Sequence, residues 1–123
     1  MSKVILIVDD QPINVKLLHV VLRKNGYTTL EAIDGKQGVE MARAQKPDLI
    51  LMDKNMPVMD GLEATQVLKE DNTTKDIPII CISSSAMKGD REIILESGCD
   101  EYISKPVDIY KVLEIVAQYI QKQ

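Results

Sequence analysis

The stretch LILMDKNMP, residues 49–57, runs from four apolar residues into Asp53 and then reaches a proline. A second stretch, VILIVDD at residues 4–10, follows the same pattern and ends in Asp9 and Asp10. A short continuous apolar run indicates a strand that is covered on both faces, as strands of a parallel sheet are. An unpaired carboxylate is costly to bury, so both strands are expected to end at a polar site.

Strand and helix patterns alternate along the whole chain. Short apolar runs bounded by turn residues predict strands, and apolar residues at helical spacing predict helices. Asp34 with Gln37, and Asp60 with Glu63, have the spacing of capping boxes at helix starts. The predicted strands span residues 4–8, 27–32, 48–53, 77–83 and 100–104. Three predicted helices begin at Pro12, Asp34 and Asp60, and two more span residues 87–97 and 107–120.

Five strands alternating with five helices predict an α/β fold. The expected architecture is a doubly wound five-stranded parallel sheet in the order 2-1-3-4-5, flanked by helices on both faces, as in flavodoxin-like folds. Right-handed crossovers carry the chain from each strand to the next. The 123 residues are long enough for a sizeable core and too short for two domains, so we expect one domain.

The composition argues against several classes of function. No apolar run is long enough to span a bilayer, and the start of the chain lacks the layout of a signal peptide. A net charge of −4 without a Lys/Arg-rich stripe argues against direct nucleic acid binding. Cys81 and Cys99 are not spaced as a metal clip, so we expect reduced structural thiols and a cytoplasmic location.

In an open parallel sheet, ligands bind at the carboxyl ends of the strands, beside the point where the strand order reverses. With the first and third strands adjacent, three carboxylates are expected around one crevice, with a hydroxyl and an ammonium on its far side. The residues are Asp9 and Asp10 after the first strand, Asp53 at the end of the third, Ser83 at the end of the fourth, and Lys105 after the fifth.

The three carboxylates predict a magnesium site. Like charges in one pocket oppose ionisation unless a cation is present. One or two carboxylates with waters and a phosphate oxygen are usual Mg²⁺ ligands, whereas Ca²⁺ takes more ligands from a flexible loop. The metal would neutralise charge on an incoming phosphoryl group, and Lys105 would contact another of its oxygens. A carboxylate can also act as the nucleophile, and Asp53 is best placed for this at the centre of the sheet.

A simpler interpretation applies to each of these residues taken alone. A single aspartate at a strand end is often a helix cap or a turn residue, and Lys105 alone would be a surface lysine. Their combination at one predicted sheet edge favours a site. His19 is the only histidine of the chain, and we interpret it as a solvated or partly packed side chain on a helix.

These motifs resemble the receiver domain of two-component response regulators, and the resemblance covers essentially the whole chain. The matching pieces are VDD at residues 8–10, MDKNMPVMDG at 52–61, Ser83 within CISSSA, and YISKP at 102–106. The resemblance implies a phosphoacceptor switch of a two-component or phosphorelay system. Its phosphodonor would be a sensor histidine kinase or a histidine phosphotransfer protein. It would be no enzyme, beyond catalysing its own aspartyl phosphorylation and dephosphorylation.

The resemblance also implies roles for single residues. Asp53 is the expected phosphoacceptor. Asp10 and Asp53 are expected to bind Mg²⁺ directly, together with the main-chain carbonyl of Asn55, and Asp9 is expected to act through water. Lys105 is expected to contact the phosphoryl group.

A second group of residues is implied to carry the signal away from the site. Ser83 is expected to move toward the phosphoryl group, and Tyr102 resembles the aromatic switch residue of the family. The Lys105–Pro106 peptide is expected to be cis. Downstream protein targets would bind the surface of the fourth helix, the fifth strand and the fifth helix, to which Arg91 and Leu95 are expected to contribute.

The sequence departs from the common family pattern without losing a required group. Ser83 stands where threonine is more frequent, and Lys54 adds a cation next to the phosphoacceptor, where an apolar residue is common. Residues 1–123 contain no output domain, so we expect a stand-alone, single-domain regulator, and a receiver cut from a larger regulator is the alternative. Its sequence is similar to regulators tied to bacterial cell-cycle or developmental control.

Two other functions fit the sequence less well. A magnesium-dependent phosphohydrolase with an aspartyl phosphate would need a second acid two residues after the nucleophile, and Asn55 cannot protonate a leaving group. A flavodoxin-like FMN carrier would need a Ser/Thr/Gly-rich phosphate loop and aromatic residues around the flavin. The chain instead has the acidic DDQPIN at residues 9–14 and contains no Trp or Phe.

Overall fold

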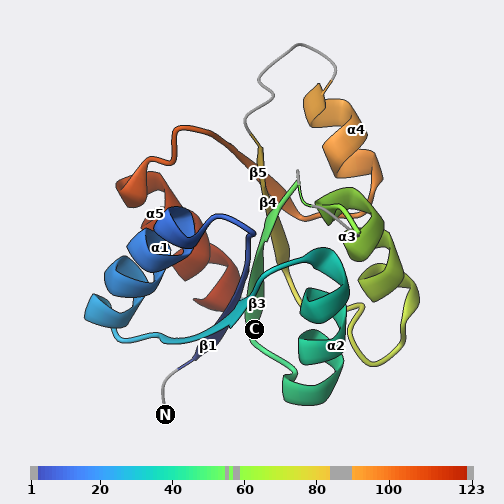
Figure 1. Cartoon of the computed structure of the whole chain (residues 1–123), viewed down its shortest axis with the longest axis horizontal. Helices are drawn as coiled ribbons and strands as arrows, with labels where there is room; N and C mark the ends of the chain where they lie inside the picture. The colour runs from blue at the N-terminus through green and yellow to red at the C-terminus, as the bar shows by residue number, and fades with distance from the viewer. Residues whose placement is uncertain (1–2, 55, 57–58, 84–89, 122–123) are drawn as a thin grey trace.

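The structure, a computed structural model, describes residues 3–54, 56, 59–83 and 90–121. Figure 1 shows a central sheet with helices on both of its faces. Within the described residues the strands are β1 (Val4–Val8), β2 (Thr28–Ala32), β3 (Leu49–Asp53), β4 (Ile79–Ser83) and β5 (Glu101–Ser104). The helices are α1 (Pro12–Lys24), α2 (Gly35–Gln45), α3 (Gly61–Glu70), α4 (Asp90–Glu96) and α5 (Ile109–Gln121). The predicted alternation is confirmed.

All strand pairs of the sheet are parallel, and the order is β2-β1-β3-β4-β5, as predicted. β3 is the central strand, and its neighbours are β1 and β4. Val8 lies opposite Met52, so the aspartates that follow both residues leave the sheet at the same level. Ser83 ends β4 opposite Ser104, one residue before Lys105. The strand ends that carry the predicted site residues are therefore adjacent along one edge.

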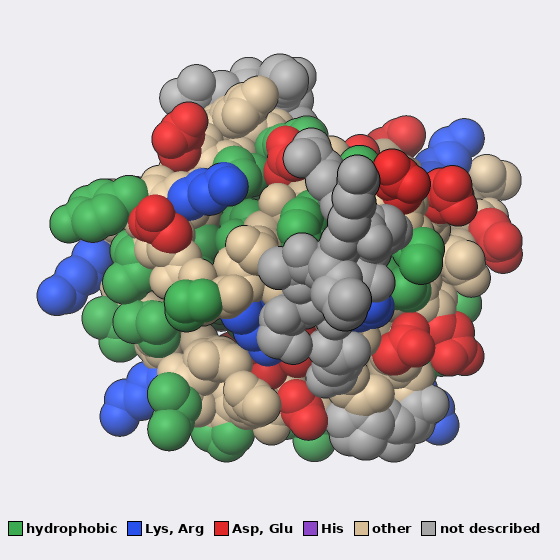
Figure 2. All heavy atoms as spheres, turned by 90° about the horizontal axis from the view of Figure 1, so that it is seen from above, with side chains coloured by type: hydrophobic (Ala, Val, Ile, Leu, Met, Phe, Trp, Pro, Cys, Tyr) green, Lys and Arg blue, Asp and Glu red, His purple; other side chains and the backbone are tan. Residues whose placement is uncertain are grey.

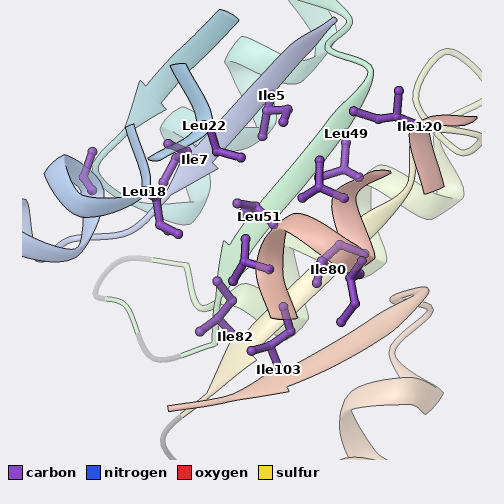
Figure 3. Close-up of a cluster of buried hydrophobic side chains, with 14 residues drawn as sticks. Ile5, Ile7, Leu18, Leu22, Leu49, Leu51, Ile80, Ile82, Ile103 and Ile120 are labelled. Carbon is purple, nitrogen blue, oxygen red and sulfur yellow. The ribbon is translucent and has the colours of Figure 1, made fainter. Parts of the chain in front are cut away.

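Side chains alternate across the strands and form two buried cores, one on each face of the sheet. One core joins the sheet to α1 and α5, and Figure 3 shows the isoleucine and leucine side chains that fill it. The other core joins the sheet to α2, α3 and α4 and includes Met52 and Cys81. Burying one such aliphatic side chain contributes roughly 1.5–3 kcal/mol, so these cores hold the strands and their polar ends in register.

The two predicted caps begin their helices as expected. The Asp34 carboxylate accepts the main-chain N–H of Gln37 at 2.8 Å, and the Asp60 carboxylate accepts that of Glu63 at 2.9 Å. The side chain of Gln37 returns to the N–H of Ile33, one residue before the cap, instead of to the cap residue itself. These bonds satisfy main-chain donors that a helix start leaves without partners.

Two element starts, those of α5 and β4, lie two residues after the predicted ones for local reasons. α5 begins at Ile109 because the Asp108 carboxylate accepts the N–H of Tyr110 at 3.0 Å, as a cap residue does. β4 begins at Ile79 because Pro78, the residue before it, has no N–H to donate. α4 spans Asp90–Glu96, and residues 87–89 of the predicted helix lie outside the described part of the chain.

Among the helices that the structure describes, none has both the length and the apolar character needed to cross a membrane.

Candidate functional site

Three carboxylates come together at the carboxyl ends of β1 and β3. Asp9, Asp10 and Asp53 each offer an oxygen, and these oxygens lie within 4.8 Å of one another. Asp9 and Asp53 are only 4% and 2% exposed, whereas Asp10 is exposed to solvent. Figure 2 views the molecule from this edge of the sheet, where acidic and basic side chains lie close together near the centre of the face. The structure therefore brings together the three aspartates singled out from the sequence.

Lys105 supplies a positive charge to this cluster. Its Nζ lies 3.1 Å from Oδ1 of Asp53, and the two side chains are 19% and 2% exposed. The main-chain N–H of Lys105 donates to the carbonyl of Ser83 at 2.8 Å, and the Lys105–Pro106 peptide is cis, as the resemblance implied. The main-chain hydrogen bond and the ion pair hold Lys105 at both ends. Its ammonium therefore stays beside the buried carboxylate of Asp53.

The environment of Asp9 opposes its ionisation. Burial raises the pKa of this carboxyl, and the nearby charges of Asp53 and Asp10 raise it further. The main-chain N–H of Gln11, 2.9 Å from Oδ1, and the charge of Lys105 act in the opposite direction. A cation between the carboxylates would remove the repulsion, and an all-oxygen donor set of this size suits Mg²⁺. The residues present therefore fit the predicted metal.

Ser83 lies at the end of the strand next to Asp53. It is fully buried, and Asp53 pairs with Ile82, the residue before it. This is the position expected for a hydroxyl on the far side of the crevice. Asn55, whose main-chain carbonyl the resemblance assigned to the metal, lies outside the described residues.

Tyr102 lies on β5, opposite Cys81 of β4. Its side chain is half-buried and packs against the core that covers the α2, α3 and α4 face. It also lines a cavity of about 360 Å³ whose other walls come from β5 and α5, including Glu101 and Lys111. The residue is therefore placed at the boundary between the core and the surface predicted for downstream partners. Leu95 of that surface is 36% exposed, and the side chain of Arg91 lies outside the described part.

Two features of the site were not predicted. The N–H of Gln11 donates to the Asp9 carboxylate, two residues earlier in the chain. Aspartate side chains often accept this bond in turns, so the sequence could have suggested it. The N–H of Gly61 donates to the carbonyl of Lys54 at 2.9 Å and closes the loop that follows Asp53. A Cβ on Gly61 would lie 2.2 Å from the carbonyl oxygen of Asp53, so this backbone contact needs glycine.

The histidine and the cysteines lie outside the carboxylate cluster. Nδ1 of His19 is 3.3 Å from a carboxylate oxygen of Glu31 and also contacts the Thr29 hydroxyl, which confirms a partly packed histidine. Cys81 and Cys99 are free and buried, as expected for reduced structural thiols. Hydrogen bonding with Cys99, together with burial, raises the pKa of the Cys81 thiol, so it remains protonated.

Comparisons with known proteins agree with this geometry. The family described as the response regulator receiver domain matches residues 5–117. The polar-differentiation response regulator DivK of Brucella anthropi is 40% identical over 120 residues, which are 98% of this chain and 98% of that protein. DivK of Brucella ovis shows the same identity and coverage.

Solved structures give the same result. The receiver domain of the sensor histidine kinase PA1611 from Pseudomonas aeruginosa has a TM-score of 0.91 and 35% identity, covering 98% of this chain and 99% of that one. That crystal structure has a magnesium ion coordinated in its active site cleft. The receiver domain of the Francisella response regulator 1452 has a TM-score of 0.93 and 26% identity, covering 98% of both chains.

Proposed function

The chain belongs to the response regulator receiver domain family, and from this we propose that Asp53 is the phosphoacceptor of a two-component or phosphorelay switch. Receiver domains take a phosphoryl group from a histidine kinase or a histidine phosphotransfer protein. The observation that carries the assignment is the buried carboxylate of Asp53, with the Lys105 ammonium 3.1 Å away and two further carboxylates within 4.8 Å. Asp53 also ends the central strand.

In the proposed reaction, an oxygen of Asp53 attacks the phosphorus of a phosphohistidine. The new oxygen–phosphorus bond forms as the nitrogen–phosphorus bond breaks, and the imidazole leaves with the electron pair of that bond. Little covalent chemistry is asked of the protein, so positioning and charge stabilisation dominate. Lys105 already lies beside Asp53, and it keeps a cation next to the phosphoryl oxygens after transfer.

We assign the metal ligands by the family pattern. Asp10 and Asp53 would bind Mg²⁺ directly, the main-chain carbonyl of Asn55 would join them, and Asp9 would act through water. When bound, the metal neutralises charge on the transferring phosphoryl group. The exposure of Asp10 supports its role as a direct ligand, since an incoming hydrated ion reaches this carboxylate first.

The proposed switch begins at Ser83 and Tyr102. The Ser83 hydroxyl would turn toward the phosphoryl group, and the Tyr102 ring would move inward from its half-buried position on β5. This movement would change the surface of α4, β5 and α5, where we propose that downstream proteins bind. The half-buried position of Tyr102 on β5, the strand next to the one that ends in Ser83, supports the proposal. We also propose that the protein acts in the cytoplasm and catalyses only its own phosphorylation and dephosphorylation.

Phosphorylation by radiolabelled acetyl phosphate tests the assignment of Asp53. We expect labelling of the wild-type chain with Mg²⁺, and its loss in Asp53→Asn and after chelation with EDTA. Asp76→Asn is the matched control, because it makes the same chemical change at an exposed position before the start of β4, away from the strand ends that carry the site. The control should be labelled like the wild type. Labelling of Asp53→Asn at the wild-type rate would show that the nucleophile is another residue.

A further inference from the structure

Gly35 brings the start of α2 into direct contact with the loop that follows the phosphoacceptor. Its N–H donates to the carbonyl of Met59 at 3.2 Å. A Cβ on Gly35 would lie 2.2 Å from that carbonyl oxygen and 2.9 Å from its carbon. The contact is between two main chains, so no side-chain rotation can relieve it. Any residue other than glycine must move one of the two segments.

The two described ends of the loop that Gly35 touches also contact each other. It begins at Lys54, directly after Asp53, and ends at Gly61, whose N–H donates to the Lys54 carbonyl at 2.9 Å. Gly61 is packed against the Asp53 main chain as closely as Gly35 is packed against Met59. Met59 is only two residues before Gly61, so a displacement of Met59 is transmitted toward the backbone of Asp53.

We propose that Gly35, a residue of α2 outside the carboxylate cluster, is a positioning residue for the metal site. It sets the distance between α2 and the loop, and the loop in turn holds Asp53 at the distance from Asp9 and Asp10 that a shared cation needs. This inference rests on the proposed function, because it takes Mg²⁺ as the ion of the site. No part of it requires Gly35 to touch the metal or the phosphoryl group.

The size of the expected displacement supports this role. An alanine at position 35 would have to separate its Cβ from the Met59 oxygen, from 2.2 Å to at least 3.0 Å. Distances in a working metal site are held to within about 0.2 Å. A shift several times this tolerance, passed even partly to Asp53, weakens binding. Residues that orient metal ligands typically change metal affinity by about 10–100-fold when mutated.

Gly26 offers a matched control. It lies at the opposite edge of the sheet, just after α1, with a φ of +91° and no atom within 4 Å of the position that a Cβ would take. Alanine there strains the backbone and lowers stability without pressing on any neighbour. Gly26→Ala and Gly35→Ala thus make the same chemical change, and both are expected to lower the melting temperature. Only Gly35→Ala is expected to disturb the site.

The first experiment titrates each full-length variant with MgCl₂ by calorimetry after circular dichroism shows that it is folded. We expect the Mg²⁺ dissociation constant of Gly35→Ala to rise ~10-fold or more. That of Gly26→Ala should stay within about twofold of the wild-type value, as for an independent distant site. A Gly35→Ala chain that binds Mg²⁺ like the wild type would overturn the proposal.

A second measurement uses the wild-type chain and so does not depend on a variant that folds. Coupling between two equilibria is reciprocal, so if the Gly35 contact favours Mg²⁺ binding, Mg²⁺ must stabilise that contact by the same factor, ~10-fold. Saturating Mg²⁺ should therefore slow hydrogen exchange of the Gly35 amide by about this factor more than it slows exchange of the Gly26 amide. The Gly26 amide is the reference because it donates to the Arg23 carbonyl, away from the site. Equal effects on both amides would contradict the proposal.

Failure of this inference can be told apart from failure of the proposed function. A wild-type chain that binds Mg²⁺ and is labelled at Asp53, together with unchanged binding by Gly35→Ala, overturns only the positioning role. A wild-type chain that binds no Mg²⁺ overturns both.

Discussion

Asp53 and Asp9 are both almost fully buried, yet their surroundings differ. Both face the other carboxylates of the cluster, but Asp53 has the ammonium of Lys105 3.1 Å from its Oδ1, whereas Asp9 accepts a main-chain N–H from Gln11. Burial is the main reason why the pKa of Asp9 is raised, and the charges of Asp53 and Asp10 raise it further. In the metal-free site the carboxylates therefore repel one another, and bound Mg²⁺ would relieve this repulsion.

We therefore predict that Asp9→Asn stabilises the metal-free protein. A carboxyl whose folded-state pKa is raised costs folding free energy above that pKa, where it is ionised. Asparagine has the same shape and keeps an oxygen for the Gln11 N–H, but it carries no charge. In EDTA at neutral pH, urea unfolding should show a gain of about 1 kcal/mol, the usual scale of one substitution. Saturating Mg²⁺ should reduce or reverse the gain. A variant less stable than the wild type in EDTA would contradict this prediction.

At the scale of elements, the sequence predicts the bounds of a helix or strand best where one local pattern determines them. Apolar runs located all the strands within two residues, and Asp34 and Asp60 located two helix starts. The strand ends then predicted which described side chains would meet. The starts of β4 and α5 were misplaced because single residues, Pro78 and Asp108, decide them. The tight contacts of Gly35 and Gly61 were not predicted, because they join segments that meet only in the folded chain.

The turn after α3 provides a prediction about pH. Hydrogen bonds from the N–H and hydroxyl of Thr73, with a smaller contribution from Arg43, lower the pKa of Asp71 to about 2 from 3.8. A carboxyl whose folded-state pKa is lowered contributes stability above its unfolded pKa and loses it as pH falls through the folded one. The stability difference between wild type and Asp71→Asn should therefore be largest near neutral pH and should shrink between about pH 4 and pH 2.

Thermal unfolding of both chains across this pH range measures the effect. Asp108→Asn is a suitable control, because Asp108 also caps with its carboxylate but lies at the start of α5, away from this turn. A difference between wild type and Asp71→Asn that stays constant from neutral to acid pH would exclude the proposed charge contribution.

At the scale of the whole molecule, the sheet order decides what the site can do. It places β1 and β3 together, so their aspartates share one crevice, and it places β4 between β3, which carries Asp53, and β5, which carries Tyr102. A change at Asp53 can therefore pass through Ser83 to Tyr102 across neighbouring strands. Moving the ratio of inactive to active states from 1:99 to 99:1 needs roughly 5.5 kcal/mol. A few charge-assisted hydrogen bonds to a phosphoryl group, at roughly 1.5–3 kcal/mol each, are sufficient.

Tyr102→Ala tests this route. If the ring carries the signal, the variant should be phosphorylated at the wild-type rate but should bind a downstream partner equally well in both states. The measurement is the ratio of partner affinities for the phosphorylated and unphosphorylated chains. Tyr27→Ala is a control, since that tyrosine precedes β2, at the opposite end of the strand order from β5, and lies outside the proposed partner surface. Full discrimination by Tyr102→Ala would rule out Tyr102 as the relay.

The central claim is that the phosphoryl group is carried by Asp53, and chemical trapping tests it most directly. Borohydride reduces an aspartyl phosphate to homoserine, which marks the phosphorylated position permanently. After phosphorylation with Mg²⁺ and acetyl phosphate, peptide mass spectrometry should find homoserine at position 53 and aspartate at positions 9 and 10. Homoserine at position 9 or 10, with aspartate retained at position 53, would contradict the account.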